Sequence, residues 1–318
     1  ASLEEYHMIE QSNKYVLVYG DAFVDYISKD QTNKSFKKFL GGATVNVAAG
    51  IGRLGSSSSF ITIIGEDDTS KFVKRELEAE GVDLSYIQVD PEKSISGVYV
   101  HLTENNDRHF HTYLDDTPDL QVDFSMIDLN AFNQASAVHF CSGTLFHAIA
   151  RETTRKIVDE IKKSSALISF DANIRPLRWN TEQQCRETIC SFLHDVDIFK
   201  ITEEALLFLT QANTQLEGLN RLAEYNISVI LVTVGANGTY AMIEGELVHI
   251  PTEKVIAVDT TGAGDAFMAG ILSKIQSEGK PETREEWIRY IAFGNKLGSI
   301  CATNFGALSA MPKLSDIN

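Results

Sequence analysis

Short apolar runs alternate along this chain with segments whose apolar residues recur at helical spacing. The first run, Tyr15–Gly20, is rich in Val and Tyr and stops at a Gly-Asp pair, as a buried strand does. Further apolar runs of strand length occupy Ser59–Ile64, Ala137–Cys141, Ala166–Phe170, Asp197–Ile201 and Val229–Val234. The segments predicted to be helical are Val45–Leu54, Thr69–Glu80, Ala150–Lys162, Thr181–Leu193, Leu216–Tyr225 and Asp265–Glu278. Strands that are apolar throughout are buried on both faces, so we predict an α/β fold, a three-layer α/β/α sandwich with a mostly parallel central sheet.

Two stretches break this alternation. Residues 26–40 are polar and rich in Lys, and residues 94–116 contain two extended runs around a polar turn. We predict that they form a small second sheet, standing beside the main sheet as a lid over the strand ends. We expect residues 1–318 to form one domain with these lid segments inserted, because the length is short for two independent domains and no linker is visible.

Charge and composition disfavour several classes of partner. Asp and Glu total 44 against 28 Lys and Arg, giving a net charge of −16, which disfavours binding to nucleic acid and to anionic membranes. The longest apolar runs, such as Val229–Val234, are too short to cross a bilayer. The first residues lack the pattern of a secretion signal, and the four cysteines show neither a CxxC pair nor metal-ligand spacing. We therefore expect a cytoplasmic protein with reduced thiols.

The segment Asp259–Gly270 carries the strongest chemical signal. Two glycines, Gly262 and Gly264, free the backbone for a tight turn, and small residues then begin a helix. Unpaired N–H groups at a helix start attract an anion such as a phosphate. Asp265 lies at the same turn, where a carboxylate can accept the proton of an incoming hydroxyl. The alternative is that Asp265 only caps the helix and the glycines only make the turn.

A second glycine-rich segment is Gly41–Gly55. Its Gly41-Gly42 pair precedes a predicted helix and allows a ligand to approach the backbone closely. Asn46 falls in the first turn, where its amide can both donate to and accept from sugar hydroxyls. Taken alone, the segment is equally consistent with a tightly packed helix.

Together, these segments resemble the C-terminal and N-terminal signatures of the ribokinase-like, or PfkB, carbohydrate kinases. The second departs from the usual Gly-Gly-Ala-Pro-Ala-Asn only at Thr44 and Val45. The signatures lie more than two hundred residues apart in the expected order, and the resemblance extends from about Tyr15 to about Pro312. It implies a ribokinase-like fold and ATP-dependent phosphorylation of a sugar hydroxyl. The catalytic roles that it implies fall to Asp265 as base and to Gly262, Ala263, Gly264 and Arg175 around the phosphoryl group.

The resemblance also points to a sugar. Ser169–Trp179 is similar to the Asp-Pro-Asn-x-Arg segment of the fructokinase branch, and Asn304–Pro312 is similar to the fructokinase ending. Arg175 carries a forked cation suited to phosphoryl charge, although a structural salt bridge, for example to Asp171, is the alternative. The expected reaction converts D-fructose to fructose 6-phosphate. The residues implied to bind substrate are Asp25, Gly41, Gly42, Asn46, Tyr113, Arg175 and Asp265, while the role of Asp21 stays open.

Three alternatives to fructose phosphorylation remain. The first is a 2-keto-3-deoxygluconate kinase, disfavoured because Leu114 stands where such kinases tend to carry Arg. The second is a ribokinase or nucleoside kinase. The third is a non-catalytic, sugar-binding regulatory relative, for which Ala205 is the one hint, because many family members have a Mg²⁺-organising Glu at this point.

The same resemblance places the nucleotide and its ions. Val232–Gly238 is similar to the Thr-x-Gly-x-x-Gly turn that approaches ATP in the family. The residues implied to bind nucleotide are Lys200, Thr233, Gly235, Gly238, Gly262, Gly264 and Asn295. Mg²⁺ is expected because the triphosphate charge must be neutralised, with Glu203 or Glu204 as substitutes for the missing Glu. By analogy, Asp259 and Gly306 help to hold K⁺, and lids pair into a homodimer.

Overall fold

The central feature of the computed structural model is a large twisted sheet. The structure describes residues 2–3, 14–105, 107–115, 118–258, 260, 262–304 and 306–317, and within them nine strands form this sheet. In spatial order they are β13 (Glu246–Ile250), β12 (Thr239–Ile243), β11 (Val229–Thr233), β10 (Ile198–Thr202), β9 (Leu167–Asp171), β8 (Ala135–Cys141), β1 (Tyr15–Tyr19), β4 (Ser58–Ile64) and β5 (Ile87–Val89). All neighbours from β11 to β5 pair in parallel, and every residue of β1, β4, β8 and β9 is buried. The prediction of a mostly parallel buried sheet is confirmed.

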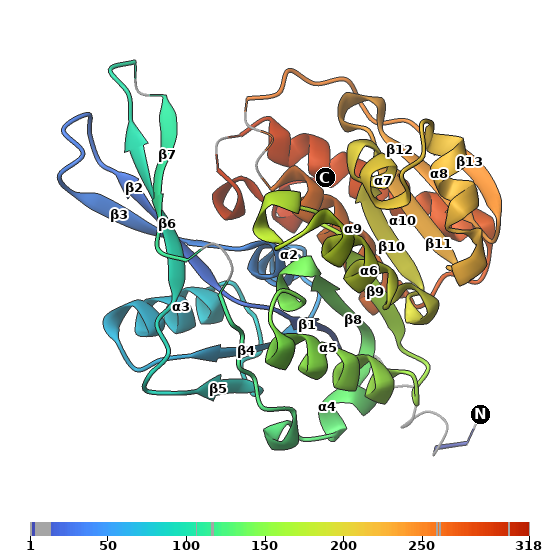
Figure 1. Cartoon of the computed structure of the whole chain (residues 1–318), viewed down its shortest axis with the longest axis horizontal. Helices are drawn as coiled ribbons and strands as arrows, with labels where there is room; N and C mark the ends of the chain where they lie inside the picture. The colour runs from blue at the N-terminus through green and yellow to red at the C-terminus, as the bar shows by residue number, and fades with distance from the viewer. Residues whose placement is uncertain are drawn as a thin grey trace.

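Helices cover both faces of this sheet (Figure 1). One apolar core lies between the sheet and α2 (Ala43–Arg53), α3 (Asp68–Ala79), α9 (Ala263–Glu278) and α10 (Arg284–Ala302). The other core involves α4 (Asn130–Asn133), α5 (Ala148–Ile161), α6 (Glu182–Cys190), α7 (Glu203–Thr210) and α8 (Gln215–Arg221). The three-layer α/β/α architecture is therefore confirmed. Among the described residues, no helix is both long enough and apolar enough to span a membrane.

Helices α2 and α9 pack unusually closely. A Cβ placed on Gly50 of α2 would lie 2.9 Å from the Cβ of Ala269 in α9. That distance is shorter than carbon atoms tolerate, so glycine is required here for the two helices to approach. The close approach brings together the two glycine-rich segments that the sequence singled out.

The edge hairpin formed by β12 and β13 is absent from the sequence prediction. These strands pair antiparallel, and the turn between them places Glu244 and Gly245 at φ values of 49° and 81°. Positive φ at both turn residues is a hairpin geometry for which the dipeptide Asn-Gly is the usual sequence signal. A Glu-Gly turn gives a much weaker signal in the sequence.

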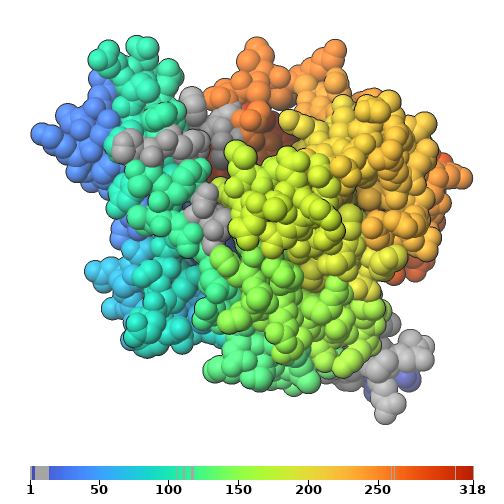
Figure 2. Space-filling view, in the orientation of Figure 1, coloured from blue at the N-terminus to red at the C-terminus, as the bar shows by residue number. Residues whose placement is uncertain are grey.

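The small second sheet is confirmed. Its strands, in the order β3 (Phe36–Gly41), β2 (Phe23–Ser28), β6 (Ser96–Leu102) and β7 (Arg108–Tyr113), project from one side of the molecule (Figures 1 and 2). The rings of Tyr26 and Tyr99 stack with centroids 4.7 Å apart on one of its faces. Val98 and Val100 are buried within the subunit.

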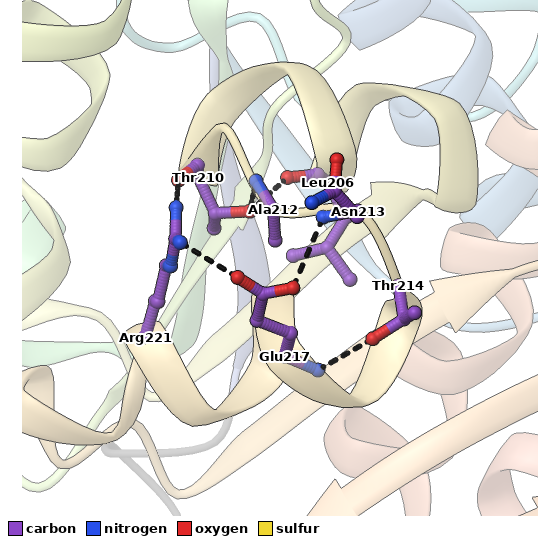
Figure 3. A network of polar contacts seen from close by, with 7 residues as sticks. All are labelled: Leu206, Thr210, Ala212, Asn213, Thr214, Glu217 and Arg221. Carbon is purple, nitrogen blue, oxygen red and sulfur yellow. Dashed lines mark hydrogen bonds and ion pairs between the residues drawn. The ribbon is translucent and has the colours of Figure 1, made fainter.

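A polar network locks α7 to α8 (Figure 3). Arg221 donates to the carbonyl oxygen of Thr210 and to Glu217, both over 2.6 Å, and Glu217 accepts from the backbone N–H of Asn213 over 3.2 Å. Thr214 caps α8 by accepting from the N–H of Glu217. The network fixes the direction of α7, whose first turn enters the cavity described below.

Candidate active site

Three parallel strands bring polar residues to one edge of the main sheet. Cys141 ends β8, Asp171 ends β9, and Lys200 lies near the end of β10. Asp171 is the lateral partner of both other residues, so the three side chains lie on the same face of the sheet. In open α/β sheets, ligands bind outside the carboxyl ends of the strands. Helix α9 begins above this row.

Asp265 occupies the third residue of α9, facing α2. Its Oδ2 accepts a 3.0 Å hydrogen bond from Nδ2 of Asn46. Burial raises the pKa of Asp265 to about 7, although Lys200, the Asn46 hydrogen bond and Arg175 lower it and Asp171 raises it further. The helix cap is Gly262, at φ 77°, so the alternative that Asp265 is the N-cap does not hold.

The first turn of α9 leaves donors free. The N–H groups of Gly264 and Asp265 have no hydrogen-bond partner in the part of the chain that the structure describes. A Cβ on Gly264 would lie 2.7 Å from Nζ of Lys200, and a Cβ on Gly262 would lie 2.9 Å from Ala307. Both glycines therefore admit close neighbours, and the resulting turn suits an anion.

Lys200 forms a buried ion pair. Its Nζ lies 3.0 Å from Oδ2 of Asp171, and both side chains are at most a tenth exposed. Burial lowers the pKa of Lys200, but the carboxylates of Asp171 and Asp265 more than offset this, so its pKa is raised. The suggested pairing of Asp171 with Arg175 does not occur. Arg175 is exposed and makes no side-chain hydrogen bond or ion pair with the described residues.

A cavity of about 550 Å³ opens beside this turn. Six of the seven residues expected to bind nucleotide line it, while Gly262 does not; the six are Lys200, Thr233, Gly235, Gly238, Gly264 and Asn295. Gly235 and Gly238 have φ values of 54° and 83°, which glycine adopts without strain. Glu203 and Glu204, in the first turn of α7, also line the cavity, and Glu203 accepts a 2.9 Å bond from Gln215.

The amide of Asn295 is already used within the protein. Its Oδ1 accepts from Thr239 over 2.8 Å, and its Nδ2 donates to the carbonyl oxygens of Ile250 and Pro251 over 3.0 and 3.3 Å. Asn295 therefore shapes the cavity wall through its packing, and its polar atoms hold the β13 end in place.

Five of the seven residues expected to bind sugar lie around the start of α2; they are Asp25, Gly41, Gly42, Asn46 and Asp265. Oδ2 of Asp25 lies 3.0 Å from the position of a Cβ on Gly41, and Gly42 caps α2 at φ 103°. Burial raises the pKa of Asp25 to about 6, with Arg108 acting in the opposite direction. Oδ1 of Asn46 is buried and has no hydrogen-bond partner among the described residues. A buried acceptor without a partner is costly, which favours a ligand donor at this point.

A second cavity, of about 650 Å³, extends from Asp25 between the small sheet and the C-terminal segment. Arg108 and Gly306 line it, whereas Tyr113 lines neither cavity and is half exposed under the guanidinium of Arg178. Asp259, expected at a K⁺ site, lies outside the described residues.

Sequence reasoning missed two ion pairs. Asp21 pairs with Lys93 over 3.0 Å, which gives it a structural partner. The Asp171–Lys200 pair was also missed, although a Lys within a buried strand signals that a carboxylate must lie nearby.

A mostly parallel sheet, a helix start that carries a carboxylate beside free N–H groups, and a small sheet beside them are the features of a sugar kinase of the ribokinase-like fold. The pfkB family carbohydrate kinase model matches residues 13–314, and the chain belongs to this family.

Individual relatives agree with this membership. A fructokinase of Klebsiella pneumoniae is 34% identical over 306 residues, which cover 96% of this chain and 98% of the relative. The aminoimidazole riboside kinase of Salmonella typhimurium is 30% identical over 304 residues, covering 95% and 93%. The crystal structure of the Vibrio cholerae O395 fructokinase, with fructose, ADP and calcium bound, superposes with a TM-score of 0.84 at 30% identity, covering 95% and 96%.

Proposed function

We propose that this chain transfers the γ-phosphoryl group of ATP to D-fructose, forming fructose 6-phosphate. The observation that carries the proposal is the Asp265 carboxylate in the first turn of α9, where it bonds to Asn46 while the preceding residue, Gly264, lines the 550 Å³ cavity. The similarity to fructokinases over nearly the whole chain supports fructose as the acceptor.

Asp265 acts as the general base. As the sugar oxygen forms its bond to the γ-phosphorus, the bond from that phosphorus to the β–γ bridging oxygen breaks, and the hydroxyl proton moves to Asp265. The free N–H groups of Gly264 and Asp265 face the transferring oxygens together with the rest of the Gly262–Asp265 turn, which includes Ala263. The guanidinium of Arg175, whose positive charge already acts on Asp265, adds to the stabilisation of the transferring phosphoryl group.

The sugar is held by groups that already lie close together. Asp25 accepts from sugar hydroxyls, and the Gly41-Gly42 backbone permits their close approach. The buried Oδ1 of Asn46 gains a donor when a hydroxyl binds, while its Nδ2 keeps Asp265 in position. Tyr113 contacts the sugar once the small sheet acts as a lid.

Mg²⁺ accompanies the nucleotide in this proposal. It supplies charge neutralisation of the transferring phosphates. Among the described residues no cluster of three or more His, Cys, Asp or Glu could hold a metal ion. Mg²⁺ binds through one or two carboxylates and the phosphates themselves, and three carboxylates line this cavity, those of Glu203, Glu204 and Glu253.

Three further parts of the proposal concern ions, assembly and location. K⁺ binds near Asp259 and Gly306, since the segment that follows Gly306 touches the Gly262 turn. The chain forms a homodimer through the small sheet, and it works in the cytoplasm. Light scattering of the purified protein and activity in KCl against NaCl test the first two parts.

A coupled assay of ADP release over a sugar panel tests the acceptor. The panel contains D-fructose, 2-keto-3-deoxygluconate, ribose and aminoimidazole riboside, each with ATP and Mg²⁺. We expect the highest kcat/KM with fructose. Turnover confined to a riboside would assign the nucleoside alternative, and sugar binding without turnover would assign the regulatory one.

A further inference from the structure

We propose that Asp171 is a positioning residue for phosphoryl transfer, because it holds the ammonium group of Lys200 against the first turn of α9. This inference rests on the proposed kinase reaction and names a residue that acts through Lys200 and touches no substrate itself.

The geometry of the sheet sets the pair. Asp171 and Lys200 are lateral partners on β9 and β10, so their side chains leave the same face at adjacent positions. The 3.0 Å contact joins Oδ2 to Nζ, with only 5% and 10% of the two side chains exposed. Such a buried contact leaves the ammonium group little freedom to move.

The far side of the same ammonium group meets α9. Nζ lies 2.7 Å from the position of a Cβ on Gly264, so it touches the backbone at the helix start. Helix N-termini carry partial positive charge, and an ammonium group placed there is repelled until an anion arrives. Asp171 counters this repulsion and keeps the cation in place before nucleotide phosphates bind.

Asp171 is the carboxylate in direct contact with Lys200 among the described residues. Asp265 also attracts the ammonium group through its charge, but its Oδ2 is bonded to Asn46. His139, one strand over, bonds to Ser169 over 2.8 Å, and burial lowers its pKa to about 4, so it is neutral.

The arrangement also ties Asp171 to the base. The charged and titratable groups that face Asp265 are Lys200 from β10, Asp171 from β9, Cys141 from β8 and Arg175 from the loop after β9, with the Asn46 amide from α2. Removing the negative charge of Asp171 lowers the pKa of Asp265, and removing the positive charge of Lys200 raises it.

A double-mutant cycle tests the proposal, with ADP affinity by calorimetry and the pH dependence of kcat/KM as readouts. Lys200→Met is expected to lower kcat/KM by about a hundredfold, as for loss of one charge-stabilising group. Asp171→Asn is expected to lower ADP affinity and kcat/KM by about tenfold, as for loss of a residue that orients a binding group without touching the ligand. The double variant should be no worse than Lys200→Met alone, because both changes remove one interaction. The acid limb of the pH profile of kcat/KM should move to lower pH in Asp171→Asn and to higher pH in Lys200→Met.

Two further variants separate positioning from folding. Asp171→Glu keeps the charge and displaces the carboxylate by one methylene, so it should reproduce the loss of ADP affinity, whereas a merely structural counter-ion would be rescued. Asp197→Asn is the matched control, since Asp197 directly precedes β10 and accepts from the N–H of Ile168, at the opposite end of the strand from Lys200. It should change thermal stability without moving the acid limb.

The proposal is overturned if Asp171→Asn keeps wild-type ADP affinity and its acid limb, or if the two single losses multiply in the double variant. Failure of the proposed reaction looks different. In that case the wild type releases no ADP with any sugar, while the ADP-binding cycle still reports on the link between Asp171 and Lys200.

Discussion

Nδ2 of Asn46 lies 3.0 Å from Oδ2 of Asp265, and this hydrogen bond joins residues 219 positions apart in the chain. It connects the first turn of α2 to the first turn of α9. The amide has a second polar atom, Oδ1, which is buried and unpartnered within the described part of the chain. One side chain thus bonds the carboxylate through Nδ2 and keeps Oδ1 as an acceptor, which the proposed function assigns to a sugar hydroxyl.

Replacing Asp265 with Asn should lower kcat by at least about a hundredfold, because the attacking hydroxyl loses its base. ATP should still bind, since the variant leaves the cavity walls unchanged. Steady-state kinetics and calorimetry with an ATP analogue check both statements. Glu285→Gln, in the first turn of α10, is a matched control with wild-type turnover expected. Near-normal turnover in Asp265→Asn would remove this residue from the role.

The rate of the wild type should rise with pH and level off above about 7. The pKa of Asp265 is raised to about 7, and only the ionised carboxylate accepts a proton. Asn46→Ala removes a hydrogen bond to the ionised form, so the acid limb of kcat/KM should move to higher pH. A pH–rate profile with Asn130→Ala as control measures the shift. An unmoved limb in Asn46→Ala would show that the amide does not tune the base.

Asp265 should also cost stability at neutral pH. Its folded pKa of about 7 exceeds the ordinary value of 3.8, so the folded state binds the proton more tightly than the unfolded state. The destabilisation therefore grows as pH rises from about 4 to about 7 and is constant above. Asp265→Asn should melt above the wild type at pH 8, and the difference should shrink towards pH 4. Melting curves at several pH values test this, and a constant difference would contradict it.

Arg175→Met should lower kcat by about a hundredfold or more, as expected for loss of one group that stabilises transition-state charge. Its melting temperature should stay at the wild-type value, because Arg175 is exposed and makes no ion pair with the described residues. Arg75→Met, on α3, provides the control for an exposed arginine. A large loss of stability with unchanged kcat would return Arg175 to a structural role.

Asn295→Ala should destabilise the protein by about 1–3 kcal/mol, because Thr239 and the carbonyl oxygen of Ile250 lose a buried partner. The KM for ATP should rise less than it would on loss of a direct contact with the nucleotide, since the amide already bonds within the protein. Chemical denaturation and ATP kinetics separate the two effects. A raised KM for ATP at unchanged stability would show a direct contact with the base of the nucleotide.

The sequence predicted the parts of the fold that depend on local patterns. Continuous apolar runs predict buried strands, and the Gly262–Gly264 turn predicts the start of a helix, α9. The Asp171 contact was misjudged because Arg175 is nearer in sequence. Asn173, at φ 37°, turns the chain after β9, and the lateral neighbour Lys200 becomes the partner. Lateral strand order is a long-range property that no local pattern contains.

The role of Asn295 shows the same limit. The family resemblance implies that Asn295 lies near the nucleotide, and the residue does line the cavity. The hydrogen-bond partners of its amide depend on the path of β13, because one of them is the carbonyl oxygen of Ile250. Strand β13 follows a Glu-Gly turn, which is a weak hairpin signal in the sequence.

The close packing of Gly50 against Ala269 has a consequence for biosynthesis. Asn46 is translated 219 residues before Asp265, so its segment leaves the ribosome well before the helix that carries the carboxylate. A nascent chain therefore contains most of the strands of the main sheet before it contains the partner of Asn46. Under the proposed function, a nascent chain that still lacks α9 has no general base for phosphoryl transfer.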